Sequence, residues 1–152
     1  MAQSFSSVYL HLVFSTKNRV PCIIPELHSR LWAYLGGICR GLHCTPVQIG
    51  GTSDHVHILC LLSRDIAVQN LVAKVKAESS KWIKRQNPPV PDFHWQTGYG
   101  IFSVNPKERG AVIEYIINQE EHHRSRTFQE EFLLFLKKYD ISYNEQYLWD
   151  EP

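Results

Sequence analysis

The order of strand-like and helix-like segments is the feature that most constrains the fold of this chain. Residues 7–15 show the alternation of a β-strand, whereas apolar residues from Pro25 to Leu42 recur at the spacings of three and four that a helix requires. The remaining segments are a short strand at 46–49, a strand at 54–62, a helix over 66–86 and an extended stretch at 93–104. This order predicts an α+β, ferredoxin-like βαββαβ sandwich, in which two helices cover an antiparallel sheet. We expect the first and third strands to be central and one sheet face to be free of helices.

Two further helices are predicted after this unit. Asn105-Pro106 offers an N-cap followed by proline, and Thr127 precedes Glu130 at the spacing of a capping box. The proline-rich stretch 86–91 is too short to separate domains and is expected to be a loop. The chain is therefore expected to form one domain over 1–152, with a core at 7–104, two helices within 105–140 and a tail at 141–152 to which no structure is assigned.

Charge and cysteine content narrow the class of protein. The formal net charge is only +1, but residues 1–110 hold 12 Lys and Arg against 6 acids, whereas residues 111–152 hold 4 against 9. A basic body of this kind could present a face that binds a polyanion. The four cysteines lack Cys-x-x-Cys spacing and fit buried thiols of a reducing cytosol better than a disulfide framework. No signal peptide or membrane span is recognised.

The first candidate for chemistry is His55-Val56-His57 in the predicted strand 54–62. Residues i and i+2 of a strand point to the same face, about 7 Å apart along the chain. Two such imidazoles can hold one divalent metal ion. Taken alone, a His-x-His pattern is a weak signal, and two histidines on a solvated strand face explain it better.

The second candidate is the pair Tyr115 and Gln119, four residues apart on a predicted helix. Because Ile113, Ile116 and Ile117 form an apolar stripe, we expect Tyr115 to project away from the core with Gln119 beside it. A tyrosine that simply packs on a neighbour is the alternative.

Together the two candidates suggest phosphoryl chemistry. Two imidazoles and an amide are neutral ligands, so a bound ion would keep its charge and polarise a phosphate. A nearby tyrosine could form a covalent phosphotyrosine. No cluster of Asp and Glu, as a water-using nuclease would need, is visible in the sequence.

A separate set of residues is expected to bind DNA. The helix 66–86 carries five cations against one acid, and tryptophans could stack on bases, although we expect Trp82 to be core. The candidates are Lys74, Lys81, Lys84, Arg85 and Trp95, and the alternative is a solvated helix face with both tryptophans buried.

Two runs resemble the signature motifs of a known family. Gly50-Gly51-Thr52-Ser53-Asp54-His55-Val56-His57 and Tyr115-Ile116-Ile117-Asn118-Gln119 are similar to those of the small single-tyrosine HUH transposases of bacterial insertion sequences, the IS200-like family. The resemblance extends from Tyr9 to Asp150.

This resemblance implies specific roles. His55, His57 and Gln119 would be the ligands of Mg²⁺ or Mn²⁺, and Tyr115 would be the nucleophile. The implied substrate is single-stranded DNA folded into hairpins at the element ends, cut through a 5′-phosphotyrosine. The implied assembly is a homodimer with composite active sites in the cytoplasm of a bacterium or archaeon.

Two other functions are left open. One is a domesticated relative that nicks hairpins without moving itself. The other is a non-enzymatic ferredoxin-like module that binds single-stranded nucleic acid, in which aromatic side chains on the sheet face would be expected.

Overall fold

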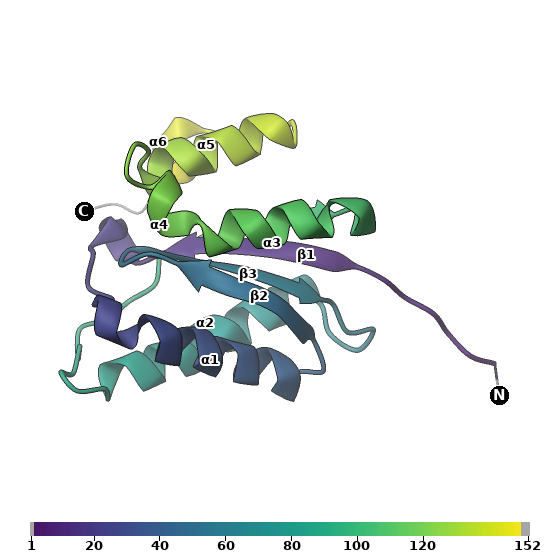
Figure 1. Ribbon diagram of the computed structural model, residues 1–152, viewed down its shortest axis with the longest axis horizontal. Helices are drawn as coiled ribbons and strands as arrows, with labels where there is room; N and C mark the ends of the chain where they lie inside the picture. The colour runs from purple at the N-terminus through teal and green to yellow at the C-terminus, as the bar shows by residue number, and fades with distance from the viewer. Residues whose placement is uncertain (1, 150–152) are drawn as a thin grey trace.

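A computed structural model describes residues 2–149, so residues 150–152 of the expected tail lie outside the described part. Four strands form one antiparallel sheet in the order β2-β3-β1-β4 (Figure 1). Their bounds are β1 Tyr9–Ser15, β2 Thr45–Gly51, β3 His55–Leu61 and β4 Gly100–Val104. The prediction of an antiparallel α+β fold is confirmed, and β1 and β3 are the central pair.

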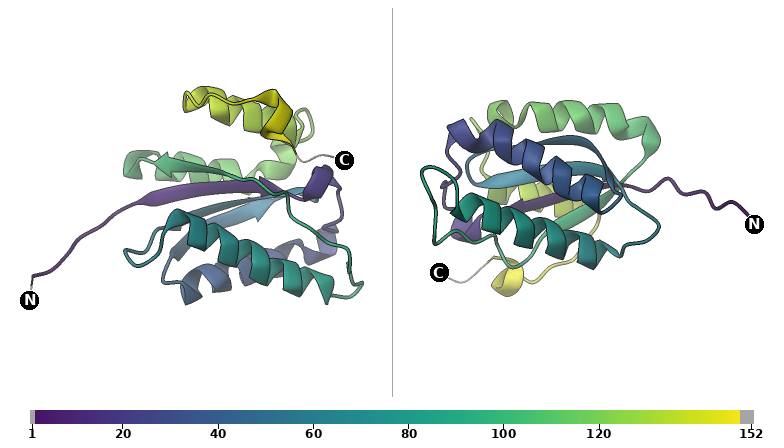
Figure 2. Two further views of the ribbon diagram at one scale, coloured as in Figure 1. Left: turned by 180° about the vertical axis from the view of Figure 1, so that it is seen from behind. Right: turned by 90° about the horizontal axis from the view of Figure 1, so that it is seen from below.

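Helices cover both faces of this sheet. On one face lie α1 Pro25–Gly41 and α2 Val68–Lys84 (Figure 2). On the other lie α3 Arg109–Ile117, α4 Gln119–His122 and α5 Phe128–Lys138 (Figure 1). Short helical turns occupy Lys17–Arg19, Pro106–Glu108 and Glu145–Leu148, the last of which is α6 within the expected tail.

The expectation of a helix-free sheet face is wrong, because the C-terminal helices fold back onto it. Val13 of β1 and Phe102 of β4 pack against Phe128 and Phe132 of α5. Leu59 of β3 packs against Ile116 of α3. Apolar side chains on this second face therefore need a second helical layer to shield them from water.

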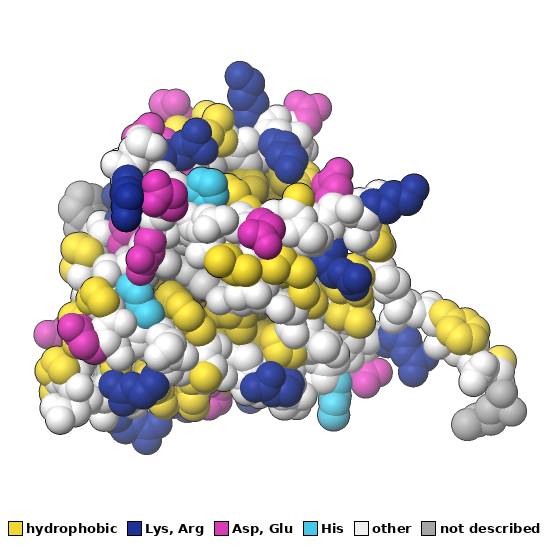
Figure 3. Space-filling model, in the orientation of Figure 1, with side chains coloured by type: hydrophobic (Ala, Val, Ile, Leu, Met, Phe, Trp, Pro, Cys, Tyr) yellow, Lys and Arg dark blue, Asp and Glu magenta, His cyan; other side chains and the backbone are white. Residues whose placement is uncertain are grey.

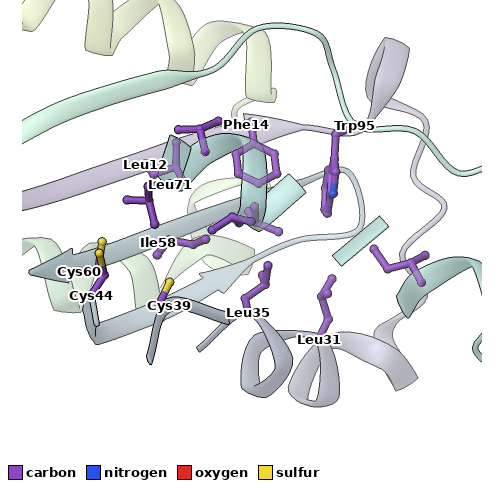
Figure 4. Packing of buried hydrophobic residues seen from close by; sticks show 14 of the residues in the cluster. Leu12, Phe14, Leu31, Leu35, Cys39, Cys44, Ile58, Cys60, Leu71 and Trp95 are labelled. Carbon is purple, nitrogen blue, oxygen red and sulfur yellow. The ribbon is translucent and has the colours of Figure 1, made fainter. Parts of the chain in front are cut away.

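The alternation of the central strands assigns their side chains to the two faces. Leu12 and Phe14 of β1 and Ile58 and Cys60 of β3 point toward α1 and α2, where they form the main core (Figure 4). The intervening residues, including His55 and His57, consequently point toward α3 and α5. Cys39, Cys44 and Cys60 are buried and Cys22 is half-buried, and all four are free thiols as predicted.

Local sequence signals account for most element ends. Asn105 caps the turn that leads into α3 through a hydrogen bond from the Lys107 N–H, 2.9 Å. Thr127 and Glu130 form the predicted capping box at the start of α5. The extended stretch expected at 93–104 is shorter as a strand, because only Gly100–Val104 pairs with β1 over a continuous ladder. Within residues 2–149 no helix has the length and apolarity needed to cross a bilayer.

Candidate active site

His55 and His57 lie on β3, which is hydrogen-bonded to a neighbouring strand on each side. Both side chains are fully buried, and their ring centroids are 5.1 Å apart. The predicted placement of two imidazoles on one face of a central strand is therefore confirmed. This strand fixes the two rings relative to one another.

Each imidazole is held through its Nδ1 atom. His55 Nδ1 lies 2.7 Å from Asp54 Oδ1 and 3.0 Å from Thr52 Oγ1. His57 Nδ1 lies 2.7 Å from His11 Nε2 on β1. A proton on each Nδ1 leaves the Nε2 lone pair free, which is how histidines that bind metals are usually oriented.

The two Nε2 atoms face a group of oxygen donors. Gln119 Oε1 lies 2.8 Å from His55 Nε2, and Glu131 Oε1 lies 2.9 Å from His57 Nε2 and 3.6 Å from His55 Nε2. The donor atoms of His55, His57 and Glu131 lie within 4.8 Å of one another. Two imidazoles and a carboxylate, with an amide beside them, form a donor set that suits a divalent cation.

Glu131 is a buried carboxylate, with 1 % of its side chain exposed. Burial alone would raise its pKa, but the charge and hydrogen bonds of His57 and His123 outweigh burial and lower the pKa well below its usual range. At His57 burial is the larger effect, because it disfavours the charged imidazole. The pKa of His57 is therefore lowered, although the Glu131 charge acts to raise it. The carboxylate is therefore ionised and the His57 imidazole neutral near pH 7, as a metal site requires.

A close approach of α3 to the sheet brings the tyrosine to this site. A Cβ atom added at Gly50 of β2 would lie 2.8 Å from the carbonyl oxygen of Ile116 and 2.9 Å from its Cγ2. Only glycine leaves room for the helix backbone at this distance. Tyr115 precedes Ile116, so the packing of β2 against α3 sets how closely the tyrosine approaches the sheet.

Tyr115 points into the site. Its ring centroid lies 5.8 Å from that of His57, and its hydroxyl donates a hydrogen bond to Glu131 Oε2. Burial raises its pKa, and the Glu131 charge adds to the effect. The phenol therefore keeps its proton near pH 7 and donates it in the hydrogen bond to the carboxylate.

The expectation that Tyr115 and Gln119 project away from the core is wrong. Gln119 is buried, whereas Ile117, which was assigned to the core stripe, is 55 % exposed. The reason is the second helical layer, because the covered sheet face lies on the side of α3 that carries Tyr115 and Ile116.

Sequence reasoning missed two residues of the site, Glu131 and His11, and it favoured a solvated helix end for a third, His123. His123 Nε2 lies 3.1 Å from Glu131 Oε2, and Gln119 Nε2 donates to the same oxygen over 3.2 Å. A signal for Glu131 was present in the sequence. It occupies a core-facing position of α5 between the buried Phe128 and Phe132, where an acid is unexpected unless it is paired.

The residues expected to bind DNA lie elsewhere. Lys74, Lys81 and Arg85 are exposed and Lys84 is half-exposed, but α2 covers the sheet face opposite to His55 and His57 (Figure 2). In the side view of Figure 3, the Lys and Arg around α3 and α5, in its upper part, are interspersed with acids rather than gathered in one stripe.

The prediction that Trp95 stacks on a base is wrong. Trp95 is only 8 % exposed, its ring packs edge-on against Phe14, and its Nε1 donates to Ser79 Oγ over 2.9 Å. It is therefore a core residue. Trp82 is half-buried and stacks on Tyr34, with ring centroids 5.1 Å apart.

Two solved structures resemble this fold. One is a protein from Deinococcus radiodurans R1 assigned as a transposase, with a TM-score of 0.60 and 21 % sequence identity over 78 % of this chain and 98 % of that one. The other is a REP-associated tyrosine transposase bound to a REP hairpin, with a TM-score of 0.60 and 13 % identity over 81 % of this chain and 73 % of that one. At these identities the likeness concerns the fold.

The sequence itself identifies the family. No curated protein matches the chain. The family model described as "Transposase IS200 like" matches residues 4–119, which include both histidines, Tyr115 and Gln119. The chain therefore belongs to the IS200-like transposase family.

Proposed function

We propose that this transposase cleaves and rejoins single-stranded DNA at hairpin-marked ends, with Tyr115 as the nucleophile. One observation carries the proposal. A single carboxylate, Glu131, contacts the Tyr115 hydroxyl with one oxygen and His57 Nε2 with the other, so the nucleophile and the imidazoles meet at one point.

A divalent cation would be held by His55, His57, Gln119 and Glu131, whose donor atoms converge. When bound, Mg²⁺ or Mn²⁺ would polarise the scissile phosphate as a Lewis acid. Asp54 accepts a hydrogen bond from His55 Nδ1 and so leaves His55 Nε2 free to bind the metal. The pKa of Asp54 is lowered, because the hydrogen bond and charge of His55 outweigh burial.

The chain's own residues carry out the transfer. Tyr115 Oη forms a bond to phosphorus while the bond from phosphorus to the 3′ oxygen breaks, which gives a 5′-phosphotyrosine and a free 3′ hydroxyl. Glu131 Oε2 accepts the phenol proton and passes it on to the departing 3′ oxygen, so the carboxylate is ionised again when the transfer is complete. Attack by another 3′ hydroxyl reverses the step and rejoins the DNA.

The search for a covalent adduct tests this proposal. The protein is incubated with Mn²⁺ and labelled single-stranded hairpin DNA from the flanks of its own gene. The wild type should form an adduct, whereas Tyr115→Phe should form none and still bind the hairpin, because only one oxygen is removed. Tyr143→Phe, at a residue 46 % exposed, is the matched control. An adduct in the Tyr115→Phe protein would refute the role of Tyr115.

A homodimer with shared sites is part of the proposal. β4 is an edge strand of the sheet and carries no charged residue that would discourage pairing with a second copy. Within one chain Tyr115 already lies beside its own His57, so sharing would require α3 to move between subunits. The domesticated and mobile forms of the enzyme would use the same chemistry.

A non-enzymatic nucleic-acid module fits the structure less well. Modules of that kind stack bases on an open sheet face. Here α3 and α5 cover the face that carries the histidines (Figure 1). The side chains beneath these helices are hydrogen-bonded to one another.

A further inference from the structure

A cavity of about 240 Å³ opens beside Tyr115, between α3 and α5. Its walls are mostly apolar and aromatic, and two cations also line it. The wall residues are Val112, Leu134, Phe135 and Tyr139, and the cations are Arg126 and Lys138. The chemistry described above uses none of these six residues.

One buried polar group opens into this cavity. His11 lines it and is only 2 % exposed. Its Nε2 is occupied by His57 Nδ1 at 2.7 Å, whereas its Nδ1 has no hydrogen-bond partner among residues 2–149. Every fully buried side-chain nitrogen or oxygen in that part of the chain has a partner, so this Nδ1 is accessible from the cavity.

The hydrogen bond to His57 determines which nitrogen of His11 carries a proton. If His57 Nε2 is to bind a metal, its Nδ1 carries the proton and donates to His11 Nε2. A neutral His11 then carries its own proton on Nδ1. The cavity is thus lined by an N–H donor, aromatic rings and two cations, and the Tyr115 hydroxyl and the Glu131 carboxylate lie at its inner wall.

We propose that this cavity receives one unstacked nucleobase of single-stranded DNA, from a nucleotide next to the phosphate that Tyr115 attacks, and that His11 Nδ1 donates to an acceptor on that base. The proposal rests on the function proposed above. The cavity is slightly smaller than the roughly 300–1,000 Å³ of typical ligand pockets, so it suits a single planar group rather than several nucleotides.

The lining matches the chemistry of a nucleotide. Aromatic side chains stack on the faces of bases, and cations contact the phosphates on either side. Phe135 lies edge-on to His11, with ring centroids 5.3 Å apart, and Tyr139 lies beyond it against Phe102. Arg126 lines both this cavity and a larger, open one of about 640 Å³ that Asp54 and His123 also line, so a strand that passes from one cavity to the other would meet Arg126.

An abasic scan tests the proposal. The Tyr115→Phe protein, which binds without cutting, is titrated with hairpin oligonucleotides in which each unpaired flanking nucleotide is made abasic in turn. We expect one position at which loss of the base weakens binding by roughly 5- to 150-fold, which corresponds to the usual contribution of one base stacked on an aromatic side chain.

A cavity-filling variant tests whether the base at that position binds in this cavity. Leu134, 46 % exposed, lines the cavity and is not one of the proposed metal ligands, so we expect Leu134→Trp to fill the cavity and leave Mn²⁺ affinity unchanged. This variant should bind the intact oligonucleotide as weakly as the abasic one, with no further loss on combining the two changes. Ile117→Trp makes a similar change at an exposed residue that does not line this cavity and should bind normally.

The outcomes separate this proposal from the function on which it rests. If the wild type forms the Tyr115 adduct but no abasic position matters, or Leu134→Trp binds normally, the base pocket is refuted and the function stands. If no adduct forms and no hairpin is bound, both fail.

Discussion

Substitution of Gly50 by alanine should displace the helix that carries the nucleophile. The new methyl group would lie 2.8 Å from the Ile116 carbonyl oxygen, whereas ordinary contacts begin at 3.4 Å, so the gap must open by 3.4 − 2.8 = 0.6 Å. The obstacle is helix backbone and cannot rotate away. Overpacking of this kind costs about 1–3 kcal/mol. At roughly 2–4 °C per kcal/mol for a protein of this size, the Tm should fall by about 2–12 °C.

Activity should fall as well. Tyr115 is bonded to Ile116 and moves with it. Because a displacement of 1 Å can cost about a hundredfold in rate, a displacement of 0.6 Å should cost about 15-fold. Single-turnover formation of the DNA adduct measures the rate, and thermal unfolding measures the Tm. Gly37→Ala is the matched control, because nothing lies within 4 Å of its added Cβ and alanine favours the helix. A Gly50→Ala protein with the Tm and adduct rate of the wild type would refute the close-approach argument.

Four other results are expected. His57→Ala should abolish Mn²⁺ binding and cleavage together, whereas Gln119→Ala should be milder because water can replace one amide oxygen; equal losses by calorimetry would contradict this. Asp54→Asn should lower metal affinity roughly 10- to 100-fold, because His55 loses the carboxylate that orients it, and unchanged affinity would remove Asp54 from the site. In the metal-free protein the lowered Glu131 pKa adds stability above its ordinary value of 4.5, which is lost as the pH falls below that value. Glu131→Gln should therefore flatten the acid side of the stability curve in urea unfolding, and an unaltered curve would exclude this source of stability. Mixing Tyr115→Phe with His57→Ala subunits should restore partial cleavage if active sites are shared, and a mixture that exchanges subunits but stays inactive would refute sharing.

The sequence predicted the sheet and the metal-facing strand because both depend on short-range periodicity. Alternation along β3 is enough to place His55 and His57 on one face, and the order of elements is enough to make β3 central. The capping box at Thr127 was equally visible, because its two residues are three apart.

The second helical layer could not be predicted in this way. Whether α5 returns to the sheet depends on contacts between Phe132 and residues far away in the chain, such as Phe102. That return covers the supposedly free face, turns Tyr115 inward and brings Glu131 to the histidines. All three errors on this face thus have one cause, the tertiary position of α5.

The division of the site between a sheet and a helical layer has a consequence for its dynamics. The imidazoles belong to a strand hydrogen-bonded on both edges, whereas Tyr115, Gln119 and Glu131 belong to helices joined by short turns. Separating these halves breaks interlayer packing but no strand ladder, so it requires less free energy than unfolding the domain. Amide hydrogen exchange should accordingly show two cooperative units, in which α3 to α5 exchange through a partial opening that leaves β1 and β3 protected. Such an opening would uncouple the nucleophile from the metal ligands while the fold persists.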